Sequence, residues 1–258
     1  MKGFGIIKPT VSVGWVEKEA PKAGLFEAVL EPVALCPCTS DVDTAQENPN
    51  IAPNRILGHE GVGRVVEIGE GVTELQVGDV VAVPAVTPMW RNLDIQDGIH
   101  QHSGGPLGGR YLSSRWDGMF GELFKVPDAD LNLAKIPEGV SLEAAALVGD
   151  MVTTGFHGVE LANVKYGDRV AVIGIGPVGL MSVAGAALRG DLSLASPSHL
   201  RVLRRLAGQG EERDEIRYRH QPVQKIRRRP DGAQRHKTAD RYRQREAQPI
   251  RCGCFFTP

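Results

Sequence analysis

The sequence has few cysteines and almost no net charge. Four cysteines among 258 residues form two Cys-x-Cys pairs far apart in the chain, Cys36 with Cys38 and Cys252 with Cys254. This spacing does not match the disulfide framework of a small secreted domain. A net charge of −1 gives no reason to expect a strongly acidic or basic partner for the chain as a whole.

Long apolar runs are also missing. One uncharged stretch, residues 171–188, approaches the length of a membrane span, but it contains four glycines and Pro177. It divides better into a strand, a tight turn and a helix. The first nine residues are too poor in apolar side chains for a secretory signal. We therefore expect a soluble, cytoplasmic protein without a membrane segment.

The even average charge conceals two chemically different parts. Residues 1–190 contain 14 lysines and arginines against 23 aspartates and glutamates, a net charge of −9. Residues 191–258 contain 16 against 8, a net charge of +8. The second part has few clustered aliphatic residues, so little apolar surface could be buried to offset the entropy of ordering it. We expect it to be a disordered basic tail.

Patterns of short strands dominate the chain up to about residue 150. Valine-rich stretches punctuated by Gly, Pro, Asp and Asn predict strands joined by turns. The expected strands are residues 11–16, 25–33, 63–68 and 79–83. Residues 90–115 have no clear period and predict a long loop.

The pattern becomes helical after Ser141, which is a suitable N-cap for a helix over 142–147. A second helix is expected over 151–163. An apolar strand at 169–173 and a small-residue helix at 177–188 then form the first strand, turn and helix of a βαβ unit. We expect nothing afterwards to complete this unit, because no valine- or isoleucine-rich run follows.

A glycine motif joins that strand to that helix. Gly174, Gly176 and Gly179 follow the G-x-G-x-x-G spacing, and Pro177 and Val178 stand between them. The motif is weak in isolation, and its bland interpretation is a glycine-rich packing turn. Between a strand and a helix, however, it is typical of a dinucleotide site, where the backbone approaches a pyrophosphate at the helix N-terminus.

The strongest chemical signal is the segment Gly58-His59-Glu60-Gly61-Val62-Gly63. It is similar to the G-H-E-x-x-G segment of zinc-containing medium-chain dehydrogenases. Cys38-Thr39-Ser40-Asp41 and Gly149-Asp150-Met151 resemble segments of the same family, in the same order. Further shared segments lie at 83–88, 100–105, 153–158 and 174–179. The resemblance covers about residues 1–190 and is nearest to the NADP-dependent secondary alcohol (isopropanol) dehydrogenases.

The resemblance implies a mixed β and α/β architecture. Residues 1–150 would form a GroES-like β-barrel catalytic domain that binds zinc. Residues 151–190 would be the truncated start of a Rossmann cofactor domain, and residues 191–258 lie outside the resemblance. Full-length members of the family are typically homotetramers.

The resemblance also implies a catalytic zinc site. Such sites use three protein ligands and leave a fourth position open, and the family's ligands fall at Cys38, His59 and Asp150. Glu60 resembles the family's auxiliary carboxylate near the metal. A lone Gly-His-Glu is usually a surface turn and a lone cysteine usually packs in a core, but their combination and order favour a metal site. We expect Cys36, two residues before the matching cysteine, to be a core residue.

The proton relay departs from the family pattern. Family members place a hydroxyl beside the metal, which matches Thr39 or Ser40, and many have a histidine where this chain has Asp43. A carboxylate at this position could accept the proton, or Asp43 could be a solvated turn residue.

Substrate and metal content follow from the same resemblance. Ala85, Val86 and Arg110 fall where secondary alcohol dehydrogenases line the substrate pocket, and Arg110 replaces an aromatic residue usual there. No cysteine lies between Cys38 and Cys252, so the four-cysteine structural zinc lobe is absent. We expect one catalytic zinc, no structural zinc, and NADP rather than NAD as the cofactor.

The basic tail has three interpretations. Residues 196–200, where the choice between NAD and NADP is normally read, carry neither the acidic residue nor the arginine that decides it. A nucleic-acid-binding arm and a disordered linker are two explanations. A shift of reading frame near Gly190 fits better, because residues 197–201 read one nucleotide later can encode Arg-Pro-Ile-Cys-Val, similar to the family's 2′-phosphate segment. We therefore expect no nucleic-acid partner.

Together these observations predict a zinc-dependent oxidoreductase that interconverts short secondary alcohols and ketones with NADP(H). Because so little of a dinucleotide site remains, we expect the chain itself to be inactive. The alternative is a zinc-binding fragment without hydride transfer.

Overall fold

A computed structural model of the chain describes residues 1–105, 108–189 and 192–196. It divides into two compact units, Met1–Asp150 and Met151–Pro258, and each is described here by itself. The tail that we expected to be disordered starts at residue 191, and its part after residue 196 lies outside the described residues. In the described part of the chain, no helix combines the length and the apolar character needed to cross a membrane.

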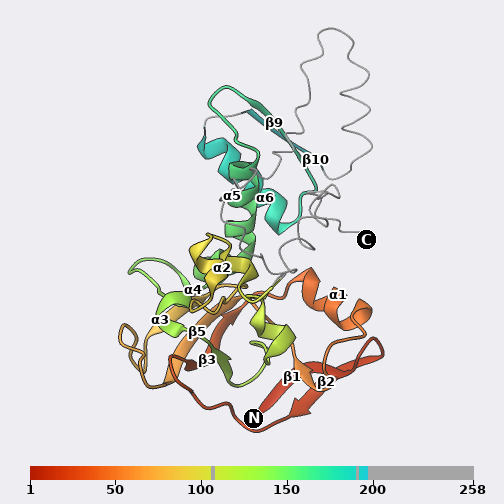
Figure 1. The fold of residues 1–258 in the computed structure, drawn as a ribbon. Coiled ribbons are helices and arrows are strands. Elements are labelled where there is room, and N and C mark those ends of the chain that lie inside the picture. Colours follow the sequence, from red (N-terminus) through yellow and green to blue (C-terminus); the bar gives the residue numbers. More distant parts are fainter. Residues whose placement is uncertain (106–107, 190–191, 197–258) are drawn as a thin grey trace, which may run out of the picture. The chain divides into compact units, whose positions relative to one another are not determined.

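Two antiparallel sheets form the framework of Met1–Asp150 (Figure 1). The smaller sheet has the order β2-β1-β4, with β1 at Lys2–Lys8, β2 at Ser12–Glu17 and β4 at Arg55–Ile56. The larger has the order β7-β3-β5-β6-β8. Its strands are β3 Ala28–Leu35, β5 Gly61–Ile68, β6 Val80–Val83, β7 Phe124–Val126 and β8 Ala134–Lys135. The four expected strands are therefore confirmed within a few residues.

Alternation along the strands of the larger sheet builds the main core. Leu30, Val65, Val81 and Phe124 are almost completely buried and pack in one cluster. Successive strand residues point to opposite faces, so the valines at alternate positions share the apolar face. Burial of each such side chain contributes about 1.5 to 3 kcal/mol relative to its exposure. This core fixes the ends of β3 and β5, next to which the segments carrying Cys38, His59 and Glu60 lie.

Short helices and turns connect these strands. The helices are α1 Thr39–Glu47, α2 Leu93–Gln96, α3 Ala129–Asn132 and α4 Leu142–Leu147. The hydroxyl of Ser141 accepts a hydrogen bond from the Ala144 N–H, as expected of an N-cap. The stretch 90–115, expected as loop, contains α2, the 3-10 turn His100–His102 and the π-type turn Tyr111–Arg115. A second π-type turn, Val148–Val152, follows α4.

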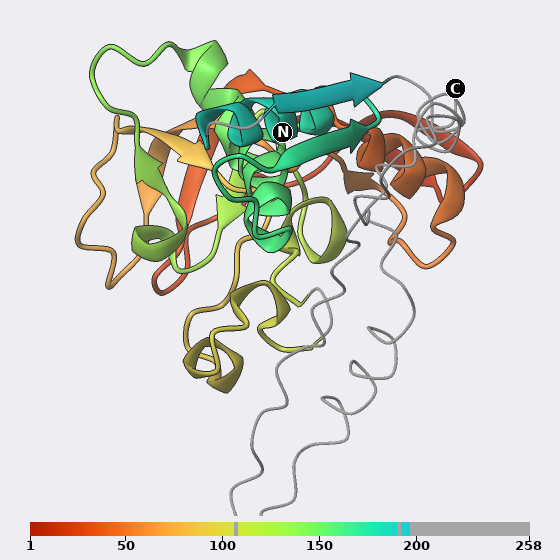
Figure 2. The same cartoon turned by 90° about the horizontal axis from the view of Figure 1, so that it is seen from above.

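The second unit contains a βαβ arrangement. Helix α5 at Thr153–Leu161 comes first in the unit. The βαβ arrangement follows, with β9 at Arg169–Ile173, α6 at Pro177–Leu188 and β10 at Leu192–Ser196. Strand β10 pairs in parallel with β9, and Figure 2 shows the two arrows side by side. The expectation that nothing after α6 completes the unit was therefore wrong. The Leu-Ser-Leu-Ala-Ser sequence of β10 lacks the valine- and isoleucine-rich signal that we required of a buried strand.

The glycine turn between β9 and α6 leaves no room for side chains. Gly174 has a φ of +95°, a conformation that side-chain-bearing residues rarely adopt. A Cβ on Gly179 would lie 1.9 Å from the carbonyl oxygen of Gly174. Gly176 is the N-cap of α6, and Pro177 is its first residue, where the missing N–H costs no hydrogen bond.

Candidate metal centre

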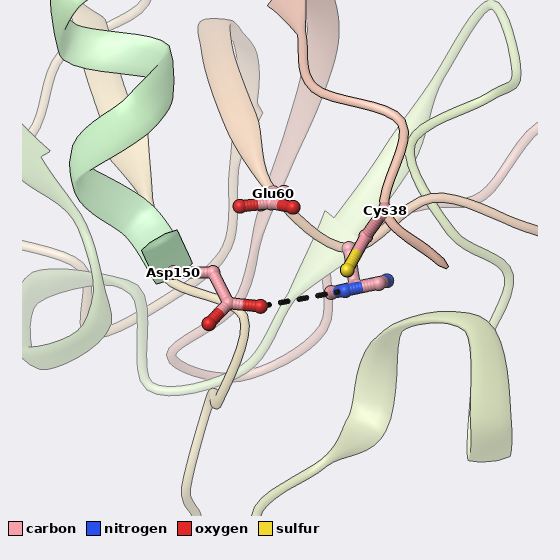
Figure 3. A group of neighbouring side chains, drawn as sticks. Cys38, Glu60 and Asp150 are labelled. Atoms are coloured by element: carbon pink, nitrogen blue, oxygen red, sulfur yellow. Dashed lines mark ion pairs between the residues drawn. The ribbon is translucent and has the colours of Figure 1, made fainter. Parts of the chain in front are cut away.

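Four metal-ligating side chains meet in Met1–Asp150. They are Cys38, His59, Glu60 and Asp150, and their ligand atoms all lie within 4.8 Å of one another. Cys38 is the residue that precedes α1, whereas His59 and Glu60 stand between β4 and β5. Asp150 belongs to the π-type turn that follows α4. Figure 3 shows the labelled side chains of Cys38, Glu60 and Asp150 converging from these separate segments.

Backbone hydrogen bonds fix the segment that carries His59. The Met119 N–H donates to the Gly58 carbonyl at 2.8 Å, and the Ser113 hydroxyl donates to the same oxygen at 2.9 Å. Gly58 has a φ of +91°, and a Cβ there would lie 2.4 Å from the ring of Phe120. The glycine before the histidine is thus required by backbone conformation and by packing.

Asp41 orients the His59 ring. Its buried carboxylate accepts hydrogen bonds from the Cys38 N–H at 3.1 Å, the Gly58 N–H at 3.1 Å and His59 Nδ1 at 3.0 Å. Because a carboxylate only accepts, Nδ1 carries the hydrogen and Nε2 faces the other three ligands. One aspartate therefore ties together the segments of Cys38 and His59. The sequence places Asp41 within a family segment but indicates no role for it.

Of the three candidate relay residues, Ser40 lies at the cluster. Its hydroxyl oxygen is 3.2 Å from His59 Nε2 and 3.4 Å from Cys38 Sγ. Thr39, the first residue of α1, is exposed. Asp43 is also exposed on α1, and no hydrogen bond joins it to Ser40 or His59 in the described part of the chain.

The cluster strongly favours a positive charge at its centre. Burial lowers the pKa of His59, but hydrogen bonds to Asp150, Asp41 and Cys38 raise it by more, to about 11. Burial and the negative charge of Asp150 raise the pKa of Glu60 to about 7, against the opposing charge of His59. Without a metal ion, the imidazolium is thus the cation that the surrounding anions hold.

The donor set fits a divalent cation of the zinc type. One thiolate, one imidazole and carboxylates are the ligands that Zn²⁺ takes, at distances of about 2.0 to 2.3 Å. A tetrahedron of this size separates its ligands by roughly 3.5 Å, and His59 Nε2 lies 3.7 Å from Asp150 Oδ2 (Figure 3, dashed line). One carboxylate oxygen of Glu60, Oε2, is buried without a hydrogen-bond partner. A cation would satisfy it.

Cys36 and the residues predicted to bind the cofactor are not members of this group of four. Cys36 is partly buried against the cluster formed by Val62, Ala145 and Ala146, as expected of a core residue. The residues predicted to bind the cofactor belong to the second unit: Gly174, Gly176, Pro177, Val178 and Gly179.

Comparison with known proteins identifies the class. Residues 25–138 match the family model of the alcohol dehydrogenase GroES-like domain. The chain belongs to the zinc-type medium-chain alcohol dehydrogenase family. It is 55% identical over 191 residues to the NADP-dependent isopropanol dehydrogenase of Thermoanaerobacter brockii, and 52% identical over 191 residues to that of Clostridium beijerinckii. Each match covers 74% of this chain and 54% of the relative, so the chain spans about half the length of these curated relatives.

Solved structures resemble the same part of the chain. The apo form of zinc dependent alcohol dehydrogenase 2 from Streptococcus pneumonia superposes with a TM-score of 0.68 at 32% identity, covering 76% of this chain and 55% of that one. Alcohol dehydrogenase TADH from Thermus sp. ATN1 gives a TM-score of 0.68 at 30% identity, covering 81% and 62%. The expected GroES-like domain is thus confirmed.

Proposed function

We propose that this chain is the metal-binding part of a zinc- and NADP-dependent oxidoreductase that interconverts short secondary alcohols and ketones. The observation that carries the proposal is the group Cys38, His59, Glu60 and Asp150, within which Asp41 fixes the tautomer of the histidine. The printed names of its relatives, NADP-dependent isopropanol dehydrogenases, supply the cofactor and the substrate class.

Each residue of the centre has a separate task. Cys38, His59 and Asp150 would hold the metal, and Glu60 would be an auxiliary carboxylate beside it. Bound Zn²⁺ supplies Lewis-acid catalysis, which brings the pKa of a coordinated hydroxyl group toward neutrality. Ser40, whose hydroxyl already contacts the ligand atoms of Cys38 and His59, would begin the proton path by accepting the substrate's proton as it releases its own hydroxyl proton to solvent. Thr39 and Asp43 are less suited, because both are exposed on α1.

The second unit would be the start of a Rossmann cofactor domain. Its β9-turn-α6-β10 order is that of the first βαβ unit of a mononucleotide-binding half, and its turn allows the close backbone approach that a pyrophosphate needs. Within the described residues up to 196, the unit has two parallel strands, fewer than the five or six of a complete domain. We therefore propose that the 258-residue chain does not transfer hydride, and that full-length relatives with the missing strands do so as homotetramers.

The first experiment separates an enzyme from a zinc-binding fragment. Purified chain would be analysed for metal, titrated with NADPH, and assayed for oxidation of 2-propanol. We expect about one zinc per chain, no saturable NADPH binding and no turnover. Saturable NADPH binding with turnover within tenfold of a full-length relative would contradict the inactivity that we propose.

A matched pair of variants tests the ligand assignment. Cys38→Ser should lose the zinc, because it removes a ligand, whereas Cys36→Ser should retain it, because Cys36 packs against the neighbouring apolar cluster. Metal that survives Cys38→Ser would refute this centre and point to Cys252 and Cys254 instead.

A further inference from the structure

Two free thiols stand two residues apart beside the metal centre. Cys38 is one of the four metal-ligating residues, whereas Cys36 is not a member of that group. Both side chains are only partly buried, and neither cysteine is joined in a disulfide. The proposed metal chemistry leaves the thiol of Cys36 without a role.

The strand register places Cys36 opposite Glu60. Antiparallel pairing of β3 with β5 ends at Leu35 and Gly61, and the Cys36 N–H donates to the Glu60 carbonyl at 3.2 Å, which extends the pairing by one residue. Residues directly opposite each other in such a pair project from the same face, with Cβ atoms about 4.5 to 5.5 Å apart. Burial first, and then the negative charges of Glu60 and Cys38, raise the pKa of the Cys36 thiol. Cys36 is therefore a protonated thiol next to the metal ligands.

The short segment between the cysteines allows their sulfur atoms to meet. Strand β3 ends at Leu35 and helix α1 begins at Thr39, so residues 36–38 belong to no strand or helix. Two peptide units keep the two Cα atoms within about 7 Å of each other, close to the range of about 4.4 to 6.8 Å that disulfides usually span. A bond between the cysteines would contract this segment slightly. Because a strained disulfide is readily reduced, such a bond suits reversible control.

We propose that Cys36 and Cys38 form a reversible redox switch, in which a small disulfide such as glutathione disulfide oxidises them to an intramolecular disulfide and releases the metal. This inference rests on the proposed function and adds regulation to the same site. The metal is lost because the thiolate is the form of cysteine that binds it, and a disulfide removes that thiolate.

Thiol–disulfide exchange accounts for each electron and proton of the step. A metal-bound thiol is deprotonated, so the Cys38 thiolate attacks one sulfur of glutathione disulfide, forms a mixed disulfide and expels a glutathione thiolate. The Cys36 thiol then loses its proton and attacks Cys38 Sγ, which breaks the mixed disulfide and expels the second thiolate. The expelled thiolates take up the proton of Cys36 and one proton from water. Two electrons pass from the cysteines to glutathione disulfide, and the oxidation state of zinc does not change.

The test uses the zinc-loaded full chain in which Cys252→Ser and Cys254→Ser remove the distant pair of thiols. It would be incubated with excess glutathione disulfide while released zinc is followed with a chromophoric chelator. Trypsin would then excise residues 23–55, which contain both remaining cysteines, for mass spectrometry without reduction. We expect loss of the bound zinc and a peptide lighter by two hydrogen atoms. Dithiothreitol should restore both the thiols and zinc binding.

Cys36→Ala is the discriminating variant, because it keeps the four metal-ligating residues and removes the thiol that resolves the mixed disulfide. Its peptide should carry one glutathione and no internal disulfide. Cys36→Ser should give the same result, which separates the loss of the thiol from a change in packing.

Three results would overturn the switch and leave the proposed function standing. They are a peptide that stays reduced, a peptide with both cysteines that keeps glutathione without an internal disulfide, and an internal disulfide that leaves zinc bound. A chain that binds no zinc before oxidation would overturn the proposed function, and the switch with it.

Discussion

Asp41→Asn tests how the metal centre is held in place. The carboxylate of Asp41 accepts three hydrogen bonds, two on Oδ1 from Gly58 and His59 and one on Oδ2 from Cys38. An asparagine oxygen can replace only one of these two oxygens, so its amide N–H₂ must face at least one N–H donor. The variant therefore loses the anchor of either the cysteine segment or the histidine ring, although its shape is almost unchanged.

Two magnitudes follow from this loss. Removing a group that orients a metal ligand typically lowers metal affinity by 10- to 100-fold, which corresponds to about 1.4 to 2.7 kcal/mol. A buried donor left without an acceptor also costs about 1 to 3 kcal/mol of folding stability. Zinc affinity would be measured by competition with a chromophoric chelator. Stability would be measured by urea unfolding of the metal-free chain, followed by the fluorescence of its three tryptophans.

Glu47→Gln makes a carboxylate-to-amide change at an exposed residue of α1 and is the control. It should change zinc affinity by less than twofold and leave the unfolding free energy unaltered. If folded Asp41→Asn binds zinc within threefold of the unaltered chain, Asp41 does not organise the centre. A loss of stability without a loss of affinity would restrict its role to anchoring the start of α1.

Two further predictions concern protons at the same centre. The pKa of Glu60 rises from 4.5 to about 7 on folding, so the folded metal-free chain binds more protons between these values and its unfolding free energy falls as pH rises through this window. Glu60→Gln should remove this decline and raise metal-free stability at pH 8 by up to about 3 kcal/mol in urea unfolding, whereas exposed Glu138→Gln should not; equal slopes in all three proteins would contradict the assignment. The raised pKa of His59, about 11, means that zinc must displace its proton at neutral pH, in addition to any proton that the thiol of Cys38 gives up on binding. Zinc affinity should therefore increase by at least tenfold per pH unit between pH 6 and 8. Calorimetry in buffers of different ionisation enthalpy should detect at least one proton released per ion in the unaltered chain, and release of none would refute the charge state inferred for the metal-free site.

Helix α1 shows where sequence patterns were insufficient. The strands over 63–68 and 79–83 were predictable because they are short valine-rich runs bounded by turn residues, and Pro177–Leu188 because a glycine turn and a proline mark its start. In Thr39–Glu47, by contrast, Asp41 is the one buried residue, so no apolar face announces a helix. A capping box between Cys38 and Asp41 marks its start. The further hydrogen bonds of Asp41 to Gly58 and His59 join residues distant in sequence, which no local pattern can reveal.

The metal-ligating group was predictable from resemblance and not from spacing. Cys38, His59 and Asp150 come from three distant segments, and the sequence alone contains no rule that brings them together. Matching family segments in the same order supplied that information. The distinction between Ser40 and Thr39 is visible only in the folded chain, because neighbouring residues at the start of a helix point in different directions.

The distance along the chain between the ligands has a consequence for folding. Cys38 and Asp150 are 112 residues apart, so an ion bound to both closes a loop that contains most of Met1–Asp150. A covalent cross-link over a loop of roughly 100 residues removes chain entropy from the unfolded state worth about 4.7 kcal/mol, and a metal ion that stays bound restricts the chain in a similar way. The ion would then act as a cross-link within the first unit. Loss of metal would weaken the association of the Cys38 and Asp150 segments before it changed any helix or strand between them.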